Sequence, residues 1–334
     1  MLNYADKPMV NDKFQAINKA YNSTFHPNSL SLGLVVPLEN YSTTAEPAME
    51  HHIERVQLAE QLGFSAVWLR DVPFNVPSFG DAGQMFDPFV YLGLLAAQTE
   101  RIALGVASIV LPLRHPAHIA KAAASVDVLS GGRLLLGVAS GDRPEEYPAL
   151  NMSFEDRGDR FRASFEYINH MWEDAPAFEN TYGSPNVDSF GGGMDMLPKP
   201  TAGKIPLLIT GGSQQDPEWI AQHGEGWITY PRSIEAQEKI ITGWRDRIKT
   251  AGIYDKPAVQ SLYIDLLEDP DAPAQAIHLG FRSGVNHLRS YLESLEAIGI
   301  NHVALNLRFN RANIETTLKR LADDVLPEFA TQER

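Results

Sequence analysis

Hydrophobic and polar positions along the chain repeat one order, which is an amphipathic helix, a glycine and a short apolar strand. At 53–62 apolar residues recur at helical spacing, and Gly63 and the apolar run 66–69 follow. Apolar runs of strand length lie at 30–36, 66–69, 102–111, 134–138, 206–210, 227–229, 259–266 and 303–307. Nearly every run precedes a helical stretch, and eight such alternations predict an α/β fold, the TIM (β/α)8 barrel. The alternative is an open doubly wound sheet, which usually carries G-x-G-x-x-G after its first strand, where this chain has VVPLENYS.

Two segments interrupt the repeat within a single expected domain, 1–334. Residues 1–28 form an N-terminal extension, and 175–204, rich in Gly, Asn, Ser and Pro, form an insertion between the helix after strand four and strand five. The insertion is either a lid over the barrel mouth or a disordered segment. We expect the loop at 268–284, after the seventh strand, to form the opposite wall of the mouth.

The stretch 102–148 predicts a strand, a helix at 116–129 and a parallel second strand. The first strand is followed by Arg114 and His115, and the second by Ser140, Gly141, Asp142 and Arg143. Because ligands bind beyond the carboxyl ends of such strands, these residues should meet at one site. His115 precedes a proline at the first helical position, which favours a helix-capping or rim residue over a proton donor.

Three motifs in this stretch, LPLRHP, LSGGR and GVASG, resemble the signature of the luciferase-like flavin monooxygenases. RDVPF, GDAGQMFDPF and GDRPEEYP are similar to a non-luminescent branch of that family, the luciferase-type oxidoreductases. The luciferases proper carry a histidine pair where this chain has Val72 and Pro73, so the resemblance does not imply light emission by this protein.

A strand running into Thr210, Gly211, Gly212 and Ser213 precedes Asp216 and Pro217, which predict a helix start. Backbone N–H groups, the Ser213 hydroxyl and the helix end could hold a phosphate, or the segment could be an ordinary tight turn. The resemblance implies an FMN phosphate after strands four and five, near Ser140, Gly141 and this turn. It also implies that Ala107 and Ser108 lie behind the flavin ring, joined by a cis peptide bond.

Charged residues at the strand ends are the candidates for catalysis. Arg70 and Asp71 close strand two and form either a rim ion pair or contacts with substrate and flavin. Asp142 and Arg143 lie near the expected flavin edge, where Arg143 could steady an anionic flavin or substrate. Other rim candidates are Tyr230, Arg232, Asn306 and Arg308, whereas Glu145 and Glu146 are expected to be solvated.

Composition limits the classes of partner. The chain has 334 residues, a formal net charge of −14 and no cysteine, which disfavours nucleic acid and anionic membranes and excludes thiolate chemistry. No spacing of metal-ligand type is present, so we expect no metal. The start lacks a signal-peptide pattern and no apolar run reaches membrane-spanning length, which predicts a soluble, cytoplasmic protein.

The resemblance narrows the expected function to an FMN-dependent monooxygenase that uses reduced FMN and dioxygen on a small organic substrate. It implies a homodimer, and a separate NAD(P)H-dependent flavin reductase would supply the reduced cofactor because the chain lacks a dinucleotide-binding motif. Two alternatives stay open, a deazaflavin-dependent hydride-transfer enzyme and a flavin-binding protein without turnover. A deazaflavin's polyglutamyl tail would favour a basic channel, which the net charge disfavours.

Overall fold

Eight parallel strands close into a barrel in this protein, whose structure is a computed structural model. It describes residues 13–41, 44, 46–76, 85–174, 176 and 195–329. The barrel strands are β1 (Ser31–Val35), β2 (Ala66–Leu69), β3 (Ala103–Val110), β4 (Leu134–Ala139), β5 (Leu207–Thr210), β6 (Gly226–Thr229), β7 (Ala258–Leu266) and β10 (His302–Asn306). Because β10 pairs with both β7 and β1, the ring is closed. The predicted TIM barrel is therefore confirmed, and every predicted apolar run forms one of its strands.

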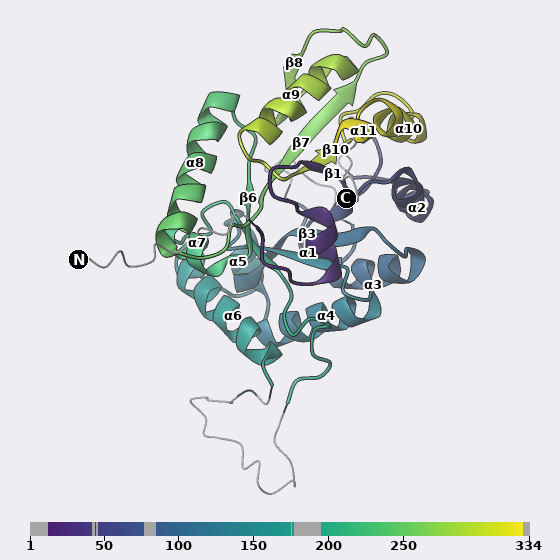
Figure 1. The fold of residues 1–334 in the computed structure, drawn as a ribbon. Helices are drawn as coiled ribbons and strands as arrows, with labels where there is room; N and C mark the ends of the chain where they lie inside the picture. Colours follow the sequence, from purple (N-terminus) through teal and green to yellow (C-terminus); the bar gives the residue numbers. More distant parts are fainter. Residues whose placement is uncertain are drawn as a thin grey trace, which may run out of the picture.

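Helices surround the strands and bury their outward side chains (Figure 1). The outer helices are α2 (His52–Leu62), α3 (Pro88–Gln98), α4 (Pro116–Leu129), α6 (Arg157–Trp172), α7 (Pro217–His223), α8 (Ile234–Ala251), α9 (Val285–Ala297) and α10 (Ile314–Asp324). Short helical segments are η2 (Leu111–Leu113), α5 (Glu146–Ala149) and α11 (Leu326–Phe329). Within the described ranges, no helix has both the length and the apolar character that crossing a membrane would need.

A short helix of the N-terminal extension, α1 (Lys19–Thr24), packs into one end of the barrel (Figure 1). Its side chains Ala20 and Tyr21 join the apolar cluster of the barrel interior. Asn18 caps α1 and also donates to the Leu134 carbonyl at 2.8 Å, so the helix is tied to the beginning of β4. This contact lies at the amino ends of the strands, opposite the end where the sequence predicts the site. Residues 1–12 lie outside the described part of the chain.

The Trp68 indole crosses the barrel interior and is hydrogen-bonded there. Its Nε1 donates to His302 Nε2 at 2.8 Å, and Ser31 Oγ lies 2.7 Å from His302 Nδ1. Two glycines make the space, because a Cβ on Gly105 would lie 2.4 Å from the indole and one on Gly33 would lie 2.7 Å from His302. A side chain at Gly105 would displace the indole, and one at Gly33 would displace the imidazole of His302.

Two regions of the chain extend beyond the regular barrel. The loop after β7 contains a hairpin, β8 (Gln275–Ile277) and β9 (Gly280–Ser283), and β9 adds to the edge of β7. The sequence predicted a loop here because the hairpin strands are short and partly exposed. The predicted insertion 175–204 follows α6, as expected, but residues 175 and 177–194 lie outside the described residues.

The arginine of the LSGGR motif, Arg133, has a structural role. It is 3% exposed, and its guanidinium donates to the carbonyls of Ala96, Thr99, Ser130 and Ile102 and to the Thr99 hydroxyl. These acceptors come from the ends of α3 and α4 and the beginning of β3. One buried side chain thus satisfies the carbonyls with which two helices end.

Replacing Arg133 by methionine should lower the free energy of unfolding by about 3 kcal/mol, because it leaves several buried carbonyls without donors. Urea denaturation followed by circular dichroism measures this change. Arg101→Met, at an exposed position between α3 and β3, should change stability by less than about 0.5 kcal/mol. Equal effects of the two substitutions would contradict the proposed role of Arg133.

Candidate active site

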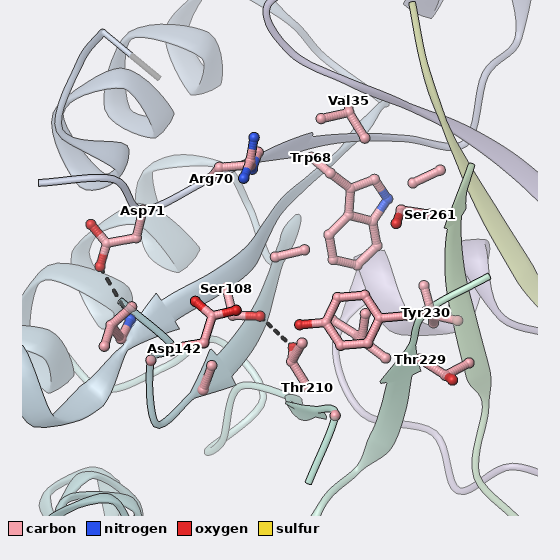
Figure 2. A pocket seen from close by; sticks show the side chains of 18 of the residues that line it. Val35, Trp68, Arg70, Asp71, Ser108, Asp142, Thr210, Thr229, Tyr230 and Ser261 are labelled. Atoms are coloured by element: carbon pink, nitrogen blue, oxygen red, sulfur yellow. Dashed lines mark hydrogen bonds between the residues drawn. The ribbon is translucent and has the colours of Figure 1, made fainter. Parts of the chain in front are cut away.

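A cavity of about 500 Å³ opens where the barrel strands end (Figure 2). This volume lies within the range typical of small-molecule sites. The structure brings to its lining the twelve residues that the sequence nominates for catalysis or cofactor binding, namely Arg70, Asp71, Ala107, Ser108, Ser140, Gly141, Asp142, Arg143, Thr210, Gly211, Gly212 and Ser213. Arg114 and His115, which the sequence placed at the same site, are not part of the lining. Tyr230 and Asn306 also line it, whereas Arg232 and Arg308 are not part of the lining.

One wall of the cavity is an irregular segment of β3. The Ala107–Ser108 peptide bond is cis, as predicted, and the register with β4 shifts between Val106 and Ile109. The Ser108 hydroxyl is hydrogen-bonded to that of Thr210 on β5, as Figure 2 shows. These two hydroxyls join the β3 wall to the strand that leads into the Gly-Gly-Ser turn.

The turn after β5 lines the cavity and contains backbone N–H groups without a protein acceptor among the described residues. Gly211 and Gln214 have positive φ angles of 56° and 58°. Within the described ranges, the N–H groups of Gly212, Ser213 and Gln214 donate to no protein acceptor. Such a concave run of N–H groups can bind an anion.

Two of the donors that the sequence suggested for this turn are already engaged. The Ser213 hydroxyl donates to the Thr210 carbonyl at 2.7 Å. The start of α7 is capped by the Asp216 carboxylate, which accepts from the Trp219 N–H at 2.7 Å. The backbone of the turn, rather than the helix end or the serine hydroxyl, therefore offers the anion site.

The turn after β4 depends on a glycine. Gly141 has a φ of 77°, and a Cβ there would lie 2.7 Å from the Val110 side chain. The preceding carbonyl, that of Ser140, accepts a hydrogen bond from the buried Tyr147 hydroxyl. This bend leaves Asp142 exposed at the cavity and directs the chain inward at Arg143.

Asp71 pairs with a residue distant in sequence. It is 5% exposed and accepts from Arg114 at 2.7 and 3.1 Å and from the Val110 N–H at 3.1 Å. The carboxylate therefore joins the end of β2 to the segment after β3. Of the two interpretations of Arg70 and Asp71, an ion pair is present, but its cation is Arg114.

The model of the Luciferase-like monooxygenase family matches residues 30–331. The chain belongs to this family. Members of the luciferase-like family are flavin-dependent monooxygenases or oxidoreductases, so the protein is a luciferase-like oxidoreductase.

Relatives within the luciferase-like family differ in cofactor. An uncharacterised protein of Mycobacterium tuberculosis, Rv0953c, is 31% identical over 67% of this chain and 82% of its own length. The F420-dependent hydroxymycolic acid dehydrogenase of the same species is 26% identical over 69% of this chain and 60% of its own. The oxygenase component of the flavin-dependent trigonelline monooxygenase of Acinetobacter baylyi is 30% identical, over 43% of this chain and 40% of its own.

Solved structures support the luciferase-like fold. The monooxygenase RslO1 from Streptomyces bottropensis superposes with a TM-score of 0.73 at 20% identity, covering 90% of this chain and all of that one. At this identity the similarity shows the fold alone.

Several lining residues of this luciferase-like site were missed by the sequence analysis, among them Trp68, Tyr263, His278 and Leu279. His278 and Leu279 form the tip of the β8–β9 hairpin, so the loop after the seventh strand does contribute a wall, as expected. Gly280 lets the hairpin approach β7, because a Cβ there would lie 1.8 Å from the Tyr263 carbonyl oxygen. Gly280, directly after His278 and Leu279, was the sequence feature that could have indicated this part of the lining.

Other expectations concern residues around the cavity. His115 caps α4, its Nδ1 accepting from the Ala117 N–H at 3.2 Å, as the sequence indicated. Among the described residues, no group of three or more His, Cys, Asp or Glu side chains is arranged to hold a metal ion.

The prediction that Glu146 is solvated is wrong. Its side chain is 1% exposed and its Oε1 lies 3.5 Å from Arg143 Nη1, whereas Glu145 is exposed as predicted. Burial raises the pKa of Glu146 to about 7, although the Arg143 charge opposes the rise. The available signals were the i, i+3 spacing to Arg143 and the adjacent Tyr147, which marks a buried face.

The raised pKa of Glu146 should make stability depend on pH. Because the folded state holds this proton more tightly than the unfolded chain, the contribution is full below about pH 4.5 and is lost as the pH rises through about 7. Relative to Glu146→Gln, the wild type should therefore lose about 2 kcal/mol of unfolding free energy between pH 5 and pH 8. Denaturant titrations of both proteins at several pH values measure this difference. Glu145→Gln should instead run parallel to the wild type, and a parallel Glu146→Gln curve would refute the prediction.

Proposed function

We propose that this protein is an FMN-dependent monooxygenase that acts with reduced FMN and dioxygen on a small organic substrate. The observation that carries the proposal is the turn after β5. It lines the same cavity as the cis Ala107–Ser108 segment, and three of its N–H groups have no protein acceptor among the described residues. A phosphate and a flat ring joined by a flexible chain would match these two parts of one lining.

The residues present fit FMN. The N–H groups of Gly212, Ser213 and Gln214 would hold the phosphate, and the bend at Ser140 and Gly141 would lie beside it. The open space beside Gly212, where no atom lies within 4 Å of an added Cβ, leaves room for the phosphate oxygens. Ala107 and Ser108 would support the ring from behind.

Bound reduced FMN would supply the activation of dioxygen, and the chain would supply orientation and a dry site. Apolar side chains line the deep part of the cavity, including Val35, Ile228, Val259 and Ala304, which exclude water. Arg143 would place a positive charge near the flavin, and Asp142 would accept a hydrogen bond at the mouth. Arg70 would contact the ligand at the opposite rim, and Asp71 would orient Arg114 and the Val110 backbone.

A deazaflavin-dependent dehydrogenase is the second candidate. It is favoured by the F420-dependent relative, whose alignment covers 69% of this chain, against 43% for the flavin-dependent trigonelline enzyme. Side-by-side equilibrium titration of the purified protein with FMN and F420 separates the two candidates, and we expect FMN to bind more tightly. Tighter binding of F420 would replace the proposed cofactor.

We also propose a separate NAD(P)H-dependent reductase as the source of reduced FMN, because the trigonelline relative is the oxygenase component of its enzyme. The purified chain with FMN and NADH alone should show no NADH oxidation above the background rate, followed by absorbance at 340 nm. Addition of a flavin reductase should start oxygen uptake. Rapid NADH oxidation by the chain alone would refute this part of the proposal.

The proposed phosphate site can be tested with a substitution that changes the charge of the turn but not the size of the side chain. Gln214→Glu is isosteric and places a carboxylate on the turn that lines the cavity, so FMN should bind at least about tenfold more weakly, a loss of about 1.4 kcal/mol. Riboflavin, which lacks the phosphate, should bind both proteins within about twofold of each other. Titrations followed by flavin fluorescence measure the four affinities.

Gln222→Glu is the matched control, because Gln222 lies at an exposed position of α7 and is not part of the cavity lining. It should leave FMN affinity within about twofold of the wild type. An equal loss of FMN and riboflavin affinity in Gln214→Glu would argue against phosphate binding at this turn.

A further inference from the structure

The wall formed by β7 and β10 lies across the barrel from the wall proposed to support the flavin. In the closed ring of eight strands, β7 is four strands away from β3 in either direction, and β10 is four strands away from β4. Ala107 and Ser108 belong to β3, and the bend at Gly141 follows β4. A flat ring supported from behind by β3 would present its free face to β7 and β10. A substrate that meets this face must therefore lie against the opposite wall.

Two polar side chains are neighbours on this opposite wall. Asn306 of β10 is paired in register with Tyr263 of β7, so the two residues lie on adjacent strands about 4.8 Å apart. Both line the cavity, and they are only 5% and 7% exposed. Val35, the partner of Asn306 on β1, and Ala304, the preceding inward residue of β10, are buried and apolar.

Each of the two side chains has a donor group without a partner among the described residues. Asn306 Oδ1 accepts from the Arg308 N–H at 3.0 Å, which fixes the orientation of the amide and leaves Nδ2 as its free end. The Tyr263 hydroxyl makes no hydrogen bond with any described residue. Neither atom is among the described polar atoms that are fully enclosed without a partner, so both stay accessible. Unpaired donors on such buried side chains are costly until a ligand or water completes them.

The ring of Tyr263 is held by other aromatic side chains. Its centroid lies 5.6 Å from that of His278 and 5.2 Å from that of Phe309. These contacts restrict the ring, so its hydroxyl is positioned before a ligand arrives. His278 and Leu279 also line the cavity, which adds aromatic and apolar surface beside Tyr263.

We propose that Tyr263 Oη and Asn306 Nδ2 are the donors that bind an uncharged acceptor oxygen of the substrate, such as a carbonyl oxygen, and so determine specificity. The inference rests on the proposed function, in which the flavin occupies the β3 side of the cavity. Two donors match the two lone pairs of one carbonyl oxygen. Neither donor is charged, so a neutral oxygen suits them better than a carboxylate, whose burial would need a charged partner. The apolar body of the substrate would lie against the rings of Tyr263 and His278.

The inference is tested on the FMN-saturated protein with two probes of nearly the same shape, para-fluoroacetophenone and para-fluoro-α-methylstyrene. The second probe carries C=CH₂ in place of C=O and cannot accept these hydrogen bonds. Fluorine NMR titrations measure both dissociation constants, and we expect the ketone to bind the wild type below about 10 mM. Tyr263→Phe keeps the ring and removes the hydroxyl. It should weaken ketone binding at least about fivefold and leave alkene binding within about twofold.

Asn306→Asp tests the second donor. The aspartate is isosteric and keeps the oxygen that accepts from the Arg308 N–H, but it replaces the free NH₂ group by an oxygen. The ketone should bind at least about tenfold more weakly, and the alkene within about twofold of the wild type. Tyr254→Phe and Asn151→Asp make the same changes at exposed positions outside the lining and should leave both affinities unchanged.

Several results would overturn the inference and leave the proposed function intact. They are ketone binding to the FMN-loaded wild type that is too weak to measure, and ketone affinity that changes no more than alkene affinity in Tyr263→Phe, which decides even where Asn306→Asp does not fold. Tighter binding of para-fluorobenzoate than of the ketone would assign the donors to an anion instead. An equal loss of FMN and ketone affinity in Tyr263→Phe would assign the hydroxyl to the flavin. Failure of FMN to bind the wild type would overturn the proposed function and this inference with it.

Discussion

The hydrogen bond between Trp68 Nε1 and His302 Nε2 fixes the floor on which the rest of the site depends. Because Nε2 accepts, the imidazole proton lies on Nδ1 and is donated to Ser31 Oγ, whose own hydroxyl donates to the Thr24 carbonyl at 2.6 Å. Burial lowers the pKa of His302 to about 3, so this neutral arrangement persists at ordinary pH. This series of hydrogen bonds runs from α1 at one end of the barrel to Trp68, which lines the cavity at the other end. Packing at the closed end thereby determines where the cavity stops.

Above that floor, the site combines fixed and adjustable charges. Asp71 is fixed, since Arg114 and the Val110 N–H occupy its oxygens. Glu146 is adjustable, because burial raises its pKa to about 7, although the Arg143 charge opposes the rise. The fixed pair shapes the wall near β2 and β3.

The sequence alone predicts the barrel and the positions that line its mouth, because strand burial, helix caps and turns follow local spacing. All eight strands, the cap at His115 and the turn at 210–213 could be predicted in this way. Side-chain partners are different. Trp68 meets His302 and Asp71 meets Arg114 only after the barrel has closed, so no spacing reveals them. The sequence predicts that Glu146 is a surface charge, because its burial depends on the bend that the chain makes at Gly141.

Backbone turns and side-chain contacts affect the choice of cofactor in different ways. The backbone turn after β5 would bind any phosphate, whether of FMN or of a deazaflavin, so it cannot select between them. Selection must come from side chains beyond the phosphate, where a polyglutamyl tail would meet the acidic surface implied by a net charge of −14. Every carboxylate of a long anionic tail would be repelled by this surface, whereas FMN would place its permanent charge only at the turn. This electrostatic argument supports our proposal of FMN, whereas the longer alignment to the F420-dependent relative favours the second candidate.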